Sequence, residues 1–134
     1  MAESSTVNPC LEAKVTGLIP MASVADVQRS IDFYKLLGMG VRGQLKASSS
    51  GDLLWAHVAY EQADLMFARS TEPVVPSRQA VLFYLYSPNL IVLREQLISA
   101  GVRVSPVTYP EYMPKGEVCI EDPDGYTLLI GQAG

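Results

Sequence analysis

An internal repeat constrains the fold of this chain more than any other feature of its sequence. Two segments carry apolar residues at helical spacing, and each begins after a serine and closes at a glycine. The first runs from Ser23 to Gly38 and the second from Ser87 to Gly101. Serine is a favoured N-cap and glycine a favoured residue at the end of a helix, so we expect two amphipathic helices with Ser23 and Ser87 as their N-caps.

Each expected helix is flanked by apolar segments in the same order. One apolar run precedes the helix, and three runs separated by turn residues follow it. The strands expected in the first half are 15–21, 39–46, 53–60 and 64–69, and those expected in the second half are 80–86, 102–108, 117–121 and 126–130. The pattern therefore predicts an α+β fold made of two tandem βαβββ modules.

The length of the chain suits one domain in which the two halves pack together. At 134 residues it can bury a sizeable core, but each half alone is small. Residues 1–13 are polar and are expected to form an N-terminal tail, with a single domain over 14–134. Its modules are expected at about 14–69 and 79–132, joined by the proline-containing segment 70–78.

Charge and composition exclude several classes of function. The net charge is -4 and the basic residues are scattered, which disfavours nucleic-acid binding. No apolar run is long enough to cross a membrane and the start resembles no signal peptide, so a soluble, cytoplasmic protein is expected. Cys10 and Cys119 lack metal-type spacing and are expected to be buried or idle thiols.

Three motifs resemble those of a known superfamily. They are the strand and helix of 19–34, which contain Val-x-Asp-Val-x-x-Ser-Ile-x-Phe-Tyr, the helix end 93–102 with Ala-Gly-Val, and the Asp-Pro-Asp-Gly turn 122–125. In this order and spacing they resemble the glyoxalase / bleomycin-resistance / extradiol-dioxygenase superfamily, also called vicinal oxygen chelate proteins. The resemblance covers 15–132 and implies curved mixed sheets around a cleft. Within the turn, Asp122 and Asp124 are expected to serve the turn itself.

The resemblance also implies where a metal would bind. In metal-dependent members, one side chain from the first and last strand of each module converges on a divalent cation. The corresponding positions here hold Ile19, Met66, Leu82 and Leu129. Hydrocarbon side chains offer no lone pairs and a thioether is too soft to hold such a cation alone. Asp64 is the one strong ligand among the same-face neighbours, so we expect neither a metal nor another cofactor.

Aromatic and apolar side chains are expected to line the cleft instead. Strand alternation places Trp55 and His57 on one face, and Tyr84 and Tyr86 on another. The loop 109–116 is rich in aromatics and proline, and is interpreted either as a lid or as a rigid connection. The tyrosines themselves are equally compatible with core packing. The expected ligand-binding residues are Trp55, His57, Met66, Leu82, Tyr84, Tyr86, Tyr112 and Leu129.

These observations favour a metal-free protein that binds an apolar, aromatic or cationic small molecule. A homodimer is expected, because open edge strands need covering and the resemblance implies clefts completed by a second chain. Exchange of modules between the two chains is one form that this dimer can take. One alternative is a glyoxalase-like lyase or isomerase, or a dioxygenase-type enzyme, with His57, Asp64 or Glu117 as catalytic candidates around a non-standard metal site. Another is a vestigial cleft in a dimerisation module. The sequence identifies neither the ligand nor a reaction, and no G-x-S-x-G motif supports a Ser-His-Asp hydrolase.

Overall fold

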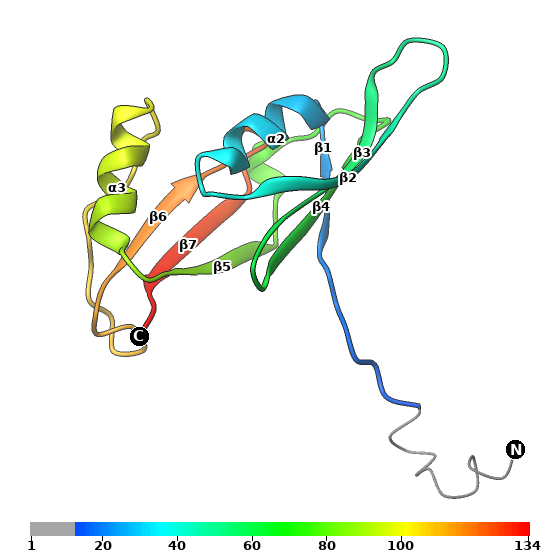
Figure 1. Ribbon diagram of the computed structural model, residues 1–134. Helices are drawn as coiled ribbons and strands as arrows, with labels where there is room; N and C mark the ends of the chain where they lie inside the picture. Colours follow the sequence, from blue (N-terminus) through cyan, green and yellow to red (C-terminus); the bar gives the residue numbers. More distant parts are fainter. Residues whose placement is uncertain (1–12) are drawn as a thin grey trace, which may run out of the picture.

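The first half of the chain forms a mixed sheet with one helix (Figure 1). The computed structural model describes residues 13–134. In this half the elements are β1 (Met21–Val24), α2 (Val27–Lys35), β2 (Gly40–Lys46), β3 (Leu53–Tyr60) and β4 (Ala63–Arg69). The strand order is β1-β4-β3-β2, with β1 parallel to β4 and the other neighbours antiparallel. This is the predicted βαβββ order.

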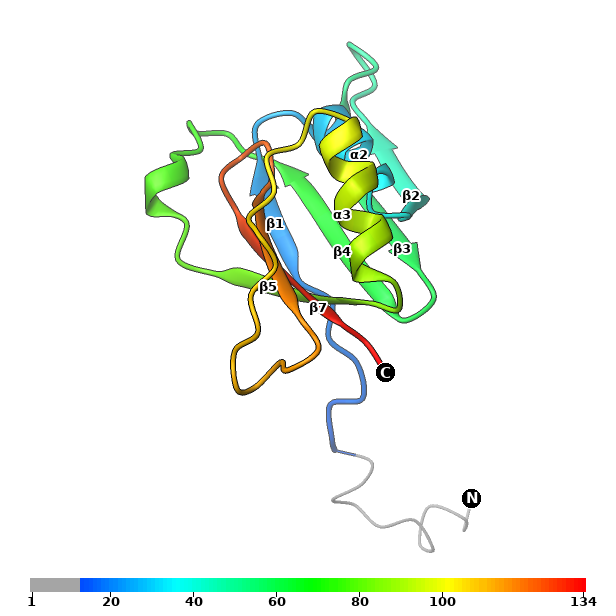
Figure 2. The same cartoon turned by 90° about the vertical axis from the view of Figure 1, so that its left-hand side faces the viewer.

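The second half repeats this plan with one strand fewer. Its elements are β5 (Leu82–Ser87), α3 (Leu90–Ser99), β6 (Glu117–Glu121) and β7 (Thr127–Gln132). The sheet order is β5-β7-β6, with β5 parallel to β7. A connection containing the short helix η2 (Pro76–Arg78) joins the halves and projects from the body in Figure 2. The α+β class is confirmed, and no helix within 13–134 is long and apolar enough to span a membrane.

The predicted strand 102–108 is wrong. This segment runs beside β6 and bonds to it at only two places: the Ser105 amide donates to the Cys119 carbonyl at 3.1 Å, and Thr108 exchanges backbone hydrogen bonds with Glu117. Pro106 lies between these residues and has no N–H to donate. The segment is therefore an interrupted edge where the first half has the continuous strand β2.

The expected N-caps are also wrong by two or three residues. Asp26 caps α2 by accepting from the Arg29 amide at 3.1 Å, and Asn89 caps α3 by accepting from the Val92 amide at 3.4 Å. Ser23 lies instead in β1, and the Ser87 hydroxyl accepts from the Asn89 amide before the helix begins. A cap must immediately precede the first helical turn to reach its free N–H groups, and both serines come too early.

The helix ends and most strand positions agree with the predictions. Gly38 and Gly101 have φ values of 91° and 89°, which suit glycine after a helix. The first strand differs, because pairing with β4 begins only where the Met66 amide donates to the Pro20 carbonyl. Residues 15–20 are therefore outside the sheet rather than in the predicted strand 15–21. The predicted tail and Cys10 fall outside the described residues, except for residue 13.

One face of each sheet packs with the helices into a single hydrophobic core. Its largest buried side chains include Val24, Ile31, Tyr34, Val58, Phe67, Leu90, Leu97, Val118, Leu128 and Ile130. Because side chains alternate along a strand, the residues between these core positions point to the opposite side. We call that side of the first sheet the first-half face, with Met21, Trp55, His57, Asp64 and Met66. The side of the second sheet that faces away from the core is called the second-half face, and it carries Leu82, Tyr84, Tyr86, Glu117, Cys119 and Leu129.

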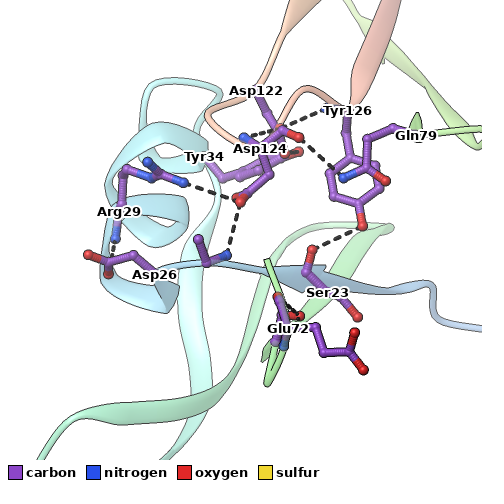
Figure 3. A network of polar contacts seen from close by, with 11 residues as sticks. Ser23, Asp26, Arg29, Tyr34, Glu72, Gln79, Asp122, Asp124 and Tyr126 are labelled. Carbon is purple, nitrogen blue, oxygen red and sulfur yellow. Dashed lines mark hydrogen bonds and ion pairs between the residues drawn. The ribbon is translucent and has the colours of Figure 1, made fainter. Parts of the chain in front are cut away.

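The acidic turn between β6 and β7 joins the two halves (Figure 3). Asp122 closes the turn by accepting from the amides of Asp124 and Tyr126, and it also accepts from the Tyr34 hydroxyl of α2 at 2.9 Å. Asp124 accepts from the Ala25 amide at 2.9 Å and pairs with Arg29 at 3.2 Å. Asp122 therefore serves the turn, as predicted, whereas the Asp124 side chain bonds outside it. Both aspartates hold α2 against the second half.

The carboxylates of this junction are buried, so they depend on their hydrogen-bond partners within the protein. Asp122 and Asp124 are only 5% and 2% exposed. Burial raises the pKa of the Asp122 carboxyl, although its backbone and Tyr34 hydrogen bonds oppose that effect. Burial, followed by the neighbouring Asp122 charge, raises the pKa of the Tyr34 phenol. A change that displaces the turn would leave these polar groups without partners inside the protein.

Gly125 offers a direct test of how tightly the turn packs. Its φ is 85°, and a Cβ there would lie 2.4 Å from the Pro76 Cβ and 2.6 Å from the Pro76 Cα. Gly51, in the β2–β3 hairpin, has a similar φ of 78° and open space around it. We expect Gly51→Ala to lower the free energy of unfolding by about 1–2 kcal/mol through backbone strain alone. Gly125→Ala should cost about 1–3 kcal/mol more, because Pro76 must also move.

Urea unfolding of the two variants measures this difference. Equal losses of stability would show that the turn does not press against the connection at Pro76.

Candidate functional site

The first-half face presents an aromatic platform. Trp55 lies on β3 beside Gly43 of β2, where a Cβ would come within 3.3 Å of the indole ring. A glycine at this position thus leaves room for the ring to lie over the neighbouring strand. His57 follows two residues later on the same face, with ring centroids 6.4 Å apart. The predicted pairing of Trp55 and His57 on one face agrees with the alternation of burial along β3.

His57 is held by Asp64 on the adjacent strand. The imidazole Nε2 lies 2.7 Å from the Asp64 carboxylate, and Arg42 approaches the same oxygen at 3.4 Å. The antiparallel register of β3 and β4 sets Ala59 opposite Asp64 and His57 opposite Met66, which brings the two polar side chains together diagonally. A carboxylate orients an imidazole in this way in many proton-transfer sites, and it also satisfies a half-buried histidine that has no catalytic role.

The second-half face contains a buried carboxylate bound by two phenols. Glu117 of β6 is 7% exposed. It accepts from the Tyr84 hydroxyl at 2.5 Å and from the Tyr112 hydroxyl at 2.9 Å. Tyr84 comes from β5 and Tyr112 from the loop 109–116, so three separate segments meet at one carboxylate.

This carboxylate changes the acidity of its neighbours. Burial and the hydrogen bond to Glu117 raise the pKa of the Tyr84 phenol. The hydrogen bond to Glu117 is the main cause that raises the pKa of Tyr112. Burial, with the charges of Glu121 and Glu117, raises the pKa of the Cys119 thiol. A less acidic thiol is a poor nucleophile at neutral pH, so Cys119 is not suited to covalent catalysis.

The loop 109–116 is fixed to the second-half face at two points. Tyr112 bonds to Glu117, and the side chain of Met113 occupies the space where a Cβ at Gly131 would lie, 2.6 Å from the Met113 methyl. Gly131 stands opposite Glu117 in the β6–β7 ladder. The loop therefore closes one end of this face. Its position over the face agrees with the interpretation as a lid, and its two fixed points agree with the interpretation as a rigid connection.

The residues at the four superfamily metal positions do not fit a metal ion. The sheet registers set Met21 level with Met66 and Tyr84 level with Leu129. Replacing Ile19 and Leu82 by these same-face neighbours still yields only thioether, phenol and hydrocarbon side chains. Nowhere in residues 13–134 do three His, Cys, Asp or Glu side chains gather in a way that could hold a metal.

The structure divides the predicted site residues between the two faces. Trp55, His57, Asp64 and Met66 lie on the first, and Leu82, Tyr84, Tyr86, Glu117 and Leu129 lie on the second, with Tyr112 bonded above it. The catalytic candidate Glu117 is therefore not joined to His57 and Asp64. The sequence did not indicate Arg42, Gly43, Met113 or Gly131 as residues of the site. Among these four, only the two glycines gave a signal, because a glycine inside a strand often marks a close approach of a neighbouring group.

Two hollows of the described chain lie away from both faces. One of about 220 Å³ lies between the connection and the acidic turn, where Ser70, Arg78 and Tyr126 are among its walls. Another of about 370 Å³ lies beside the start of α2, next to Asp26, Asp52 and Arg69. Neither includes a predicted ligand-binding residue.

Comparison with known proteins agrees with this architecture. The family model for the Glyoxalase/Bleomycin resistance protein/Dioxygenase superfamily matches residues 19–130. No curated protein matches the chain significantly.

Solved structures resemble the fold over nearly the whole chain. A bleomycin-binding protein complexed with bleomycin has a TM-score of 0.68 at 19% identity, covering 90% of this chain and all of the other. A bleomycin resistance determinant encoded on the transposon Tn5 has a TM-score of 0.70 at 18% identity, covering 88% and 98%. The antibiotic-binding protein TnmS3 from Streptomyces sp. CB03234 has a TM-score of 0.67 at 18% identity, covering 90% and 98%. At these identities the likeness establishes the fold.

Replacement of Glu117 by glutamine tests the phenol cluster. Glu117→Gln keeps the shape of the side chain and an acceptor oxygen, but removes the negative charge. The pKa of Tyr84 and Tyr112 should then fall towards the ordinary tyrosine value, because ionised phenols no longer face an anion. Ultraviolet titration of tyrosinate absorbance measures this shift, and Tyr84→Phe identifies the contribution of that residue. An unchanged titration curve would show that the cluster is not formed in solution.

Proposed function

The chain belongs to the glyoxalase/bleomycin resistance protein/dioxygenase superfamily, and on that basis we propose that it is a metal-free, small-molecule-binding homodimer. Its ligand is apolar, aromatic or cationic, and binds between the first-half face of one copy and the second-half face of its partner. The solved bleomycin-binding and antibiotic-binding proteins of the same fold support a binding role.

The observation that carries this proposal is the chemistry of the two non-core faces. Trp55 and Met66 on one face, and Tyr84, Tyr86 and Leu129 on the other, form largely apolar and aromatic walls. Polar groups are few and specifically paired, as in His57 with Asp64 and Glu117 with two tyrosines. Such a combination is typical of sites that bind organic molecules.

The metal-free character rests on donor chemistry. The superfamily metal positions carry side chains that do not coordinate divalent cations, whichever of the two same-face registers is used. His57 and Asp64 supply two donors, but they bind each other and have Arg42 as a third neighbour. A cation at that place would compete with the arginine charge.

The dimer rests on the exposed edges. β1 and β5 each end a sheet, with a partner on one side only among the described residues. Their non-core side chains are unusually exposed for apolar groups: Met21 is 61% and Leu82 is 53% exposed. Open apolar edges are normally covered in soluble proteins. Placing β1 of one copy beside β5 of the other would cover both edges and set the two faces opposite each other.

Trp55 provides a direct reading of ligand binding, because it is the single tryptophan of the chain. We expect its fluorescence to change with saturation on titration with metal-free bleomycin or with 2-naphthol, and to do so equally after EDTA treatment. Met66→Asp should weaken binding about tenfold or more, because a charge must be buried beneath the ligand. Ile98→Asp, on the 46% exposed side chain in α3, is the matched control.

Three outcomes of that titration would alter the proposal. Saturable binding lost with EDTA would restore a metal site. Absence of binding by every probe would favour a vestigial cleft. Equal weakening by Met66→Asp and Ile98→Asp would place the ligand away from the first-half face.

Sedimentation equilibrium tests the dimer. The native protein should have twice the 14.6 kDa mass of one chain. Met21→Asp should shift the mass to that of one chain without lowering monomer stability, because Met21 lies largely in solvent in the single chain. Ile98→Asp should remain dimeric. A monomeric native protein at micromolar concentration would contradict the shared cleft.

A second candidate function is proton-transfer catalysis by His57. The 2.7 Å contact with Asp64 orients the imidazole and is the observation that favours it. Mass spectrometry of ligand recovered after equilibrium dialysis separates the two functions. Unchanged ligand supports binding alone, whereas conversion that is lost in His57→Gln supports a lyase or isomerase.

A further inference from the structure

The second-half face contains a buried negative charge with no cationic partner among the described residues. Glu117 is only 7% exposed to solvent. Within residues 13–134, the polar contacts of its carboxylate are the hydroxyls of Tyr84 and Tyr112, and none of the ion pairs there includes it. Burying a carboxylate is costly unless hydrogen bonds and a counter-charge compensate it. The phenols supply the hydrogen bonds, so a counter-charge is what residues 13–134 do not provide to this site.

Two tyrosines bond to this carboxylate, and the ring of a third, Tyr86, lies beside that of Tyr84. The ring centroids of Tyr84 and Tyr86 are 5.2 Å apart at 39°, and those of Tyr84 and Tyr112 are 6.3 Å apart at 70°. Tyr86 and Tyr112 are each 65% exposed, so parts of their rings are open to a ligand. A phenol that donates to an anion gains electron density, and an electron-rich ring face attracts cations more strongly.

Anchoring the loop does not by itself require the charge. Tyr112 and Met113 both hold the loop 109–116 to this face, and Met113 does so through packing beside Gly131. A neutral acceptor such as glutamine would also bond to a tyrosine hydroxyl. What glutamate adds to such an acceptor is its negative charge, placed behind aromatic rings.

We propose that Glu117, Tyr84, Tyr86 and Tyr112 form a cage for the positively charged end of an organic ammonium ligand. The proposal rests on the proposed binding function, and it narrows the ligand class from apolar, aromatic or cationic to amines and quaternary ammonium compounds. Aromatic rings with a nearby carboxylate suit an alkylated ammonium group better than a hydrated metal ion, because the rings contact the methyl groups while the charge is neutralised.

A matched pair of probes tests the charge. Choline and 3,3-dimethylbutan-1-ol have nearly the same shape, but only choline is positive. We expect choline to bind at least about tenfold more tightly, measured by NMR titration of the tyrosine ring signals. Equal affinity for the two probes would overturn the cage, and so would failure of choline to bind while 2-naphthol still changes Trp55 fluorescence.

Matched variants test the residues. Glu117→Gln should remove the preference for choline and leave the neutral probe unaffected. Glu121→Gln makes the same change of net charge four residues along the same strand, where the side chain is exposed, and should retain the preference. Equal losses in both variants would indicate general electrostatic attraction instead of a cage.

Tyr86→Leu guards against a folding defect in Glu117→Gln. The Tyr86 side chain is largely exposed and makes none of the hydrogen bonds to Glu117, so this variant should fold normally and still bind choline about fivefold or more less tightly. Unchanged choline binding by Tyr86→Leu would remove that ring from the cage and contradict the proposal. Absence of binding by choline, the neutral probe and 2-naphthol alike would instead overturn the binding function itself.

Discussion

The buried acidic turn between β6 and β7 is the constraint on which the arrangement of the two halves depends. Asp122 organises the turn and accepts a hydrogen bond from the Tyr34 hydroxyl. Asp124 accepts a hydrogen bond from the Ala25 amide and forms an ion pair with Arg29. The Tyr126 hydroxyl donates to the Ser23 carbonyl at 3.0 Å, which ties the same turn to β1 (Figure 3). Hydrogen bonds are directional and buried polar groups must be paired, so this junction fixes orientation in a way that apolar packing alone would not. It thereby determines where both non-core faces point.

The two halves share a backbone plan and differ in the chemistry they present. Met21 stands level with Met66 in one sheet, and Tyr84 with Leu129 in the other. Where metal-dependent relatives need lone-pair donors at such positions, this chain has side chains suited to contact with organic molecules. Its polar groups are concentrated in two small clusters, His57 with Asp64 and Glu117 with its tyrosines. One fold therefore supplies two unlike walls, and a shared cleft would use both.

Much of the fold could be predicted because the signals were local. Strands 53–60 and 117–121 match the structure, as do the helix-closing glycines, since alternation, periodicity and positive φ are written in neighbouring residues. Errors arose where a local signal was weak or was overridden. Pro106 interrupts 102–108, and aspartate and asparagine nearer the helices act as caps in place of the serines. The site was predicted as a set of face residues, but not as pairs: Tyr84 and Glu117 are far apart in sequence and meet only because β5, β7 and β6 are neighbours.

The sequence by itself determined the repeated α+β plan, the apolar character of the metal positions and the side of each strand on which the aromatic residues lie. These follow from composition, spacing and the two-residue period of a strand. Only the tertiary structure decided which of those residues touch. It paired His57 with Asp64 through the β3–β4 register, and it enclosed Glu117 between a strand tyrosine and a loop tyrosine. Contacts of this kind depend on strand order and loop closure, because both bring together atoms that no local pattern connects.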